Sequence, residues 1–202
     1  MNLIEIVIKG GWVMIPIGIC SMIMVAIGVS RYLVITRETK ALAAFLREWE
    51  RSAPKPSEFR TACKFGPTLA QELMDNWEIE RTERIRLTEI ETVARQELEK
   101  LESGLGTMAT IAAVAPLLGF FGTVTGMVRA FMQIQNLGGN VNASVLAGGI
   151  WEALITTVGG LVVGIPAMLL YNYLAGKTRQ ASGLMERCAT TAVRQMGNVN
   201  EA

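Results

Sequence analysis

Three long stretches without a single charged residue constrain this sequence more than any other feature. Residues 10–30, 103–128 and 153–176 contain no Asp, Glu, Lys or Arg. Each stretch would form a helix roughly 30–40 Å long at about 1.5 Å per residue, and a bilayer core requires about 20 apolar residues. The pattern excludes a soluble globular domain, a secreted disulfide scaffold and a disordered chain. It predicts an all-α integral membrane protein.

The remaining composition narrows the function by exclusion. The net charge is +1 over 202 residues, so no basic surplus suggests a nucleic acid as partner. The three cysteines are scattered without metal-ligand spacing, and histidine is absent. The commonest metal ligand and the usual base near neutral pH are therefore missing. We expect neither an enzyme nor a metal-binding protein.

The first apolar stretch is a retained anchor by its length and its flanks. It runs from Trp12 to Val29 behind Lys9, which superficially resembles a secretory signal peptide. A signal peptide has an apolar region of only about 7–15 residues, followed by a small-x-small cleavage site. Here the stretch continues directly into Arg31 and a charged segment. We expect it to remain in the protein as the first transmembrane helix.

Counts of Lys and Arg beside the spans predict the orientation in the membrane. The predicted spans are residues 12–34, 107–135 and 144–174. Segment 31–103 holds 13 Lys and Arg residues, whereas the loop 136–142 holds none. Because basic residues concentrate on the cytoplasmic side, the central segment and the C-terminus are predicted to be cytoplasmic, and the N-terminus and the loop are predicted to lie outside.

The predicted organisation is therefore a membrane protein with cytoplasmic helical extensions. Its parts are an N-terminal segment with the first transmembrane helix (1–35), a cytoplasmic helical region (36–104), the second transmembrane helix (105–135), a short outer loop (136–143), the third transmembrane helix (144–175) and a cytoplasmic C-terminal helix (176–202).

The cytoplasmic region is expected to be mostly helical. An apolar face continues the first span through Leu42 and Leu46, until the Pro-containing segment 52–57 interrupts it. A long helix is predicted from about Pro67 into the second span, giving one helix of roughly 100 Å, with a hairpin turning near 104–106 as the alternative. Its narrow apolar stripe is typical of a helix that packs on other helices: Leu87, Ile90, Ala94, Leu98, Leu101, Leu105 and Met108.

Small residues recur on one face of the second and third spans, whereas the first span is richer in Ile, Val and Met and is expected to face lipid. Small faces allow helix backbones to approach closely inside a membrane. They favour self-association, with packing between the two spans of one chain as the alternative. The residues assigned to helix packing are Gly119, Gly122, Gly126, Gly160, Gly164, Pro116 and Pro166, the two prolines also being candidate kinks.

Polar residues at membrane depth are the candidates for function. Glu152 and Arg129 lie about two turns inside their spans, and an ionisable group there costs roughly 2.5–3.5 kcal/mol on insertion scales. Threonine hydroxyls both donate and accept hydrogen bonds, so together with a carboxyl group they would suit a proton path. The alternative is a structural Arg129–Glu152 pair that locks two helices or two subunits. The threonines concerned are Thr123, Thr125, Thr156 and Thr157.

Two motifs resemble those of the MotA/TolQ/ExbB proton-channel family. The first is the segment Ala115–Met127 (APLLGFFGTVTGM) in the second span. The second starts at Trp151 (WEALITT), and continues through Gly160-Leu161 and Ile165–Ala167 to Tyr171–Tyr173. Their order, their spacing and the short loop between them also match. Within the family the chain resembles ExbB most and TolQ next, because stators of the MotA type have a fourth span and a longer chain.

The resemblance implies a pentameric ring around two copies of a single-span partner of the ExbD or TolR type. An aspartate on that partner would carry the proton past channel-lining threonines, here Thr123 and Thr157, with Glu152 as the third-span glutamate. The resemblance also implies a place in the bacterial inner membrane, with the outer side in the periplasm. Thr156 and Arg129 are candidate secondary polar contacts, although the resemblance implies no role for Arg129.

The function implied is that of a proton-channel subunit in an inner-membrane motor, which needs no cofactor beyond protons as the coupling ion. The motor would convert the proton motive force into mechanical work on an envelope-spanning protein of the TonB type. The alternatives are a TolQ-like subunit of the Tol-Pal system, with a TolA-like protein downstream, and a non-conducting membrane scaffold.

Overall fold

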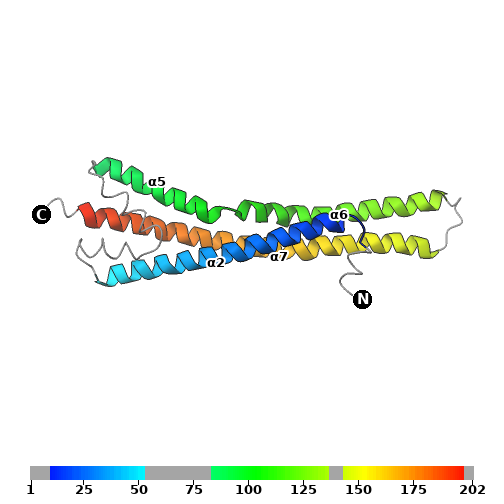
Figure 1. Cartoon of the computed structure of the whole chain (residues 1–202), viewed down its shortest axis with the longest axis horizontal. Helices are drawn as coiled ribbons and strands as arrows, with labels where there is room; N and C mark the ends of the chain where they lie inside the picture. The colour runs from blue at the N-terminus through cyan, green and yellow to red at the C-terminus, as the bar shows by residue number, and fades with distance from the viewer. Residues whose placement is uncertain (1–9, 53–82, 137–142, 198–202) are drawn as a thin grey trace. The chain divides into compact units, whose positions relative to one another are not determined.

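The computed structural model describes residues 10–52, 83–136 and 143–197, and the regular secondary structure in these ranges is helical (Figure 1). The predicted all-α fold is therefore confirmed for the described residues. Four helices make it up: α2 (Met14–Ser52), α5 (Glu83–Glu102), α6 (Leu105–Asn136) and α7 (Ala143–Gly197).

Three helical stretches are long and apolar enough to cross a membrane: Met14–Glu48, Thr92–Asn136 and Leu146–Cys188. They overlap the three spans that the sequence predicts, and they identify a multi-pass membrane protein. A smaller share of the first stretch is buried than of the other two, in keeping with its scarcity of small residues. The orientation of the termini, the cytoplasmic placement of the extensions and the pentameric ring stay predictions.

Two compact units divide the chain. The first comprises Met1–Val29 and Gly104–Asn172, and the second comprises Ser30–Ser103 and Tyr173–Ala202. Both α2 and α7 contribute to each unit, because neither helix is interrupted where the units divide. The third span therefore continues as helix beyond the predicted boundary at residue 175.

The first unit is built on antiparallel packing of α6 and α7. Contacts step along the two helices in opposite directions, since Gly126 of α6 meets Ala153 of α7 and Gly119 meets Gly160. The beginning of α2 joins them through an apolar cluster in which Met24 packs with Ile111 and Ala167. All but a few of the residues in this unit that face away from the contact are apolar, as lipid or a further helix would require.

The second unit contains the apolar face predicted on the first extension. Leu42 and Leu46 of α2 are buried there, together with Leu174 of α7. Tyr32 stacks on Tyr173 with ring centroids 6.2 Å apart. Of the predicted apolar stripe, Leu101 is buried and Ala94 and Leu98 are partly buried in this unit, while the side chains of Leu87 and Ile90 lie outside the described residues. The last two members of the stripe, Leu105 and Met108, are buried in the first unit.

The uninterrupted helix predicted to lead into the second span is wrong at Gly104. This residue has φ 81°, a left-handed conformation that glycine adopts readily after the end of a helix. The Ser103 amide donates to the Glu99 carbonyl (3.0 Å) to close the last turn of α5, and the Arg31 guanidinium donates to the Lys100 carbonyl (3.0 Å). The predicted start of this helix near residue 67 lies outside the described residues.

Candidate functional site

The candidate site lies along the contact between α6 and α7, where glycines bring the two backbones together. A Cβ atom added at Gly160 would lie 2.5 Å from the Ala115 carbonyl oxygen and 2.9 Å from the Gly119 Cα atom. Because those neighbours are backbone atoms, no side-chain rotation would make room. Packing between the second and third spans of one chain, the alternative left open by the sequence, is therefore present. Self-association stays a prediction. All five glycines assigned to helix packing lie at this contact: Gly119, Gly122, Gly126, Gly160 and Gly164.

Pro116 and Gly164 form one end of the same contact. A proline inside a helix cannot donate to the carbonyl four residues earlier, here that of Ala112. A Cβ atom at Gly164 would lie 2.5 Å from the Pro116 Cγ atom and 3.3 Å from the Ala112 carbonyl oxygen. Because Gly164 has no side chain, it leaves space for the Pro116 ring and for the Ala112 carbonyl, which lacks its usual helical donor. Pro166, the other proline in these spans, is exposed.

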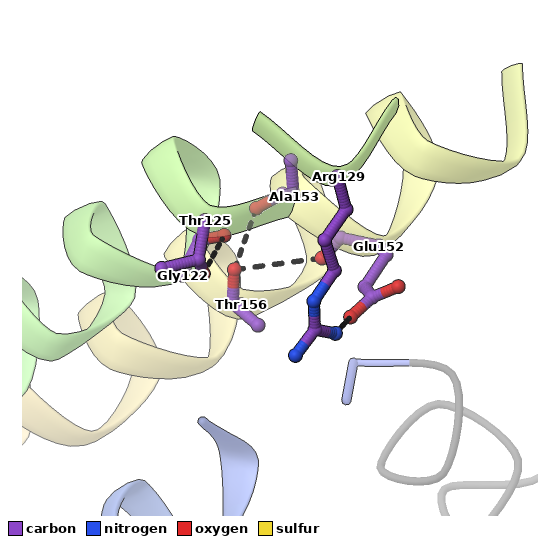
Figure 2. Close-up of polar contacts among 6 residues, drawn as sticks. All are labelled: Gly122, Thr125, Arg129, Glu152, Ala153 and Thr156. Atoms are coloured by element: carbon purple, nitrogen blue, oxygen red, sulfur yellow. Dashed lines mark hydrogen bonds and ion pairs between the residues drawn. The ribbon is translucent and has the colours of Figure 1, made fainter. Parts of the chain in front are cut away.

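Thr156 is buried in the middle of the contact. Only 1% of the residue is exposed, and its hydroxyl donates to the Ala153 carbonyl oxygen at 2.7 Å. A Cβ atom at Gly122 would overlap the Thr156 side chain, so that glycine makes the space that the threonine fills. Figure 2 shows Thr156 and Ala153 on α7 beside Gly122 on α6. The burial gives Thr156 a packing role.

The other three threonines differ in which helix they bond. Thr157 donates across the contact to the Gly119 carbonyl oxygen of α6 at 3.1 Å. Thr123 donates to the Phe120 carbonyl, and Thr125 to the Gly122 carbonyl, both within α6. Each hydroxyl has its proton engaged and keeps its oxygen as an acceptor. Thr123 lies one helical turn beyond Gly119, the residue whose carbonyl accepts from Thr157.

Arg129 and Glu152 form an ion pair between α6 and α7. The guanidinium Nη1 atom lies 3.1 Å from the carboxylate Oε1 atom, and 52% and 30% of the two side chains are exposed (Figure 2). The sequence left open whether these residues serve a proton path or pair structurally. The pair joins two helices of one chain, while a place for Glu152 at a subunit contact stays a prediction.

Gly11 contacts the same carboxylate, and the sequence analysis did not identify it as a site residue. Its φ of 68° is left-handed, and a Cβ atom there would overlap the Glu152 Oε1 atom. The Gly11 carbonyl accepts from the Met14 amide (3.2 Å) at the start of α2, and the next residue, Trp12, packs edge-on against Phe121. The only sequence signal was the Gly10-Gly11 pair before the apolar run, a common turn signature.

The chemistry available at this site is that of hydroxyls, carbonyls and one ion pair. Among the residues that the structure describes, no three His, Cys, Asp or Glu side chains gather as a metal site would require. Hydroxyl and carbonyl oxygens can accept a hydrogen bond from a protonated carboxyl group, whereas an ionised carboxylate can only accept one from a hydroxyl.

Comparison with known proteins matches the chain to one family. The profile of the MotA/TolQ/ExbB proton channel family matches residues 65–187, more than half of the chain. The biopolymer transport protein ExbB of Pseudomonas putida is 32% identical over 182 residues, covering 85% of this chain and 54% of that protein. A putative ExbB homolog of Methanothermobacter thermautotrophicus is 44% identical over 88 residues, covering 44% and 30%.

The Tol-Pal system protein TolQ of Haemophilus influenzae is 42% identical over 80 residues, covering 40% of this chain and 35% of that protein. The ExbB name recurs among the similar proteins, as the sequence motifs predict. The chain spans about half of the length of these relatives or less.

Proposed function

The chain belongs to the MotA/TolQ/ExbB proton channel family, and we propose that it is the channel subunit of an inner-membrane motor driven by the proton motive force. In this proposal five copies surround two copies of a single-span partner of the ExbD or TolR type. The motor energises an envelope-spanning protein of the TonB type. The ExbB relatives, which are named biopolymer transport proteins, favour a role in transport.

The observation that carries the proposal is the Thr157–Gly119 hydrogen bond, one turn from Thr123. The bond puts a partly buried threonine hydroxyl of α7 against the α6 backbone, one turn before a second partly buried threonine of α6. A protonated carboxyl group of the partner donates to such oxygens while it crosses, and an ionised one is released to water on the far side. In this scheme Thr157 and Thr123 line the path, and Glu152 is held beside it by Arg129.

The energy available matches mechanical work. One elementary charge that crosses the membrane releases about 2.3 kcal/mol per 100 mV, so a few protons supply several kcal/mol for mechanical work. Rotation or rocking of the ring around its partner converts that energy into movement. The protein makes and breaks no covalent bond of a substrate, and it needs no cofactor other than the coupling protons.

Two alternatives have a specific observation in their favour. The TolQ match supports a place in a Tol-Pal type of system, with a TolA-like protein downstream. The Arg129–Glu152 pair supports a non-conducting membrane scaffold, because it fastens two helices of one chain. The scaffold does not account for Thr157, whose hydroxyl is only partly buried and would be replaceable by an apolar side chain.

Proton flux through the reconstituted complex tests the proposal. The complex is purified with its partner from native membranes, placed in vesicles that contain a pH-sensitive dye, and compared with its Thr157→Val variant. We expect the variant to keep its subunit composition and to lose flux, since valine fills the space but accepts no hydrogen bond. Thr110→Val is the matched control, because Thr110 is exposed and bonds only its own helix, at the Gly106 carbonyl (3.0 Å).

Two outcomes would contradict it. Absence of flux in the wild-type complex would remove the channel and favour the scaffold. Equal flux in Thr157→Val and in the wild type would remove Thr157 from the path.

A further inference from the structure

Arg129 and Glu152 are the only charged residues in the segments 10–29 and 104–172, which make up the described part of the first unit and the loop within it. They are 3.1 Å apart at their nearest atoms and cancel each other's charge. A carboxylate at membrane depth would otherwise be the natural ligand for a metal cation. Whether the Glu152 carboxylate is free or paired therefore determines whether a metal cation can bind there.

One carboxylate oxygen of Glu152, Oε1, is already engaged. Hard cations are bound by several oxygen ligands, commonly with a carboxylate among them. Here the Oε1 atom is held by the Arg129 guanidinium, and the Gly11 backbone packs against the same atom. The nearest hydroxyl along α7, that of Thr156, is buried and donates to the Ala153 carbonyl.

Displacing the guanidinium would also be costly. Arginine stays protonated under all ordinary conditions. If a metal cation took the Glu152 carboxylate, Arg129 would lose the only carboxylate in these segments and remain as an unpaired charge beside apolar helices. A proton carried by another chain's carboxyl group past Thr157 requires no such exchange, because the ion pair stays closed.

We infer that Arg129 is a specificity-determining residue: by occupying Glu152 it excludes metal cations such as Na⁺ from the site and leaves protons as the coupling ion. The inference rests on the proposed function for its consequence in transport. Its structural half, the exclusion of Na⁺ from Glu152, is testable without any transport.

The test is thermal unfolding of the purified complex in nanodiscs, in NaCl and in N-methylglucamine chloride of equal ionic strength. A ligand that binds the folded state raises Tm with its concentration. We expect the wild type to show equal Tm in the two salts. We expect Arg129→Met to melt earlier and to gain a Na⁺-dependent rise of a few degrees, and Arg129→Met combined with Glu152→Gln to lose that rise. Arg129→Gln replaces Arg129→Met if the latter does not fold.

A Na⁺-specific rise in the wild type that disappears in Glu152→Gln would overturn the inference, because Glu152 would then bind Na⁺ despite Arg129. No rise in either Arg129 variant would overturn it as well, because the arginine would not be what excludes the metal. These readouts do not depend on flux. A wild-type complex that passes no protons would therefore refute the proposed function while leaving the Na⁺ exclusion measurable.

Discussion

Replacement of Gly160 by alanine is the perturbation that tests the α6–α7 contact most sharply. The new methyl group would start 2.5 Å from the Ala115 carbonyl oxygen, and ordinary van der Waals contact begins at 3.4 Å. That oxygen belongs to a helix backbone, so α6 and α7 must separate locally. Gly148, on the same span, has no atom within 4 Å of the corresponding position and provides the matched control.

The magnitude follows from two opposing effects. Alanine is favoured over glycine in a helix by about 1 kcal/mol, and this gain is common to Gly160→Ala and Gly148→Ala. Overpacking of a tight contact costs about 1–3 kcal/mol, and only Gly160→Ala incurs it. The two variants should therefore differ by about 1–3 kcal/mol in the free energy of unfolding. For a chain of this size each kcal/mol corresponds to about 2–4 °C in Tm.

The assay is thermal unfolding of both variants and the wild type in the same nanodiscs. We expect Gly148→Ala to melt at or above the wild-type temperature and Gly160→Ala to melt clearly below Gly148→Ala. Coincident melting of the two variants would refute the close backbone approach at Gly160. The small-residue face would then have to serve another purpose.

Three further perturbations probe the other contacts. Gly11→Ala should destabilise the protein by about 1–3 kcal/mol, since alanine is strained at φ 68° and would overlap the Glu152 carboxylate; a wild-type Tm would contradict the placement of that turn. Arg31→Met should lower the free energy of unfolding by about 0.3–1 kcal/mol, because the guanidinium donates to the Lys100 carbonyl in the last turn of α5. Amide hydrogen exchange in that turn should become faster, and an unchanged exchange rate would show that this hydrogen bond does not stabilise the helix end. Glu152→Ala should lower the yield of oligomer more than Thr157→Val does, because only the former breaks an ion pair, and equal yields would count against this assignment.

The membrane spans were predictable because charge placement alone determines them. The charge pattern predicts that the second span ends at residue 135 and the third begins at residue 144. In the structure α6 ends at Asn136 and α7 begins at Ala143, within one residue of each prediction. The break at Gly104 was harder to predict. Glycine inside an apolar pattern signals either a weak helix or a helix end, and only the observed φ of 81° distinguishes them.

The sequence predicted which residues of the spans belong to the site but not which residues contact one another. Small residues at steps of three and four identify the contact face, yet they do not say whether the partner helix belongs to the same chain. Thr156 and Thr157 are adjacent and look equivalent in sequence, although one is buried in packing and the other bonds across to Gly119. Their difference arises from a rotation of about 100° between neighbouring residues, which only the packed helix pair resolves. Gly11 lies outside any span motif, so its contact with Glu152 depends wholly on tertiary structure.

Native mass spectrometry of the protein, extracted gently from its own membranes, tests the central claim most directly. The proposed motor predicts five copies of this chain with two copies of a small single-span protein that carries an aspartate in its span. The identity of that protein would distinguish a TonB type of system from a Tol type. A ring that carries no partner even under the mildest extraction would contradict the account, because no carboxyl group would then carry the proton past Thr157.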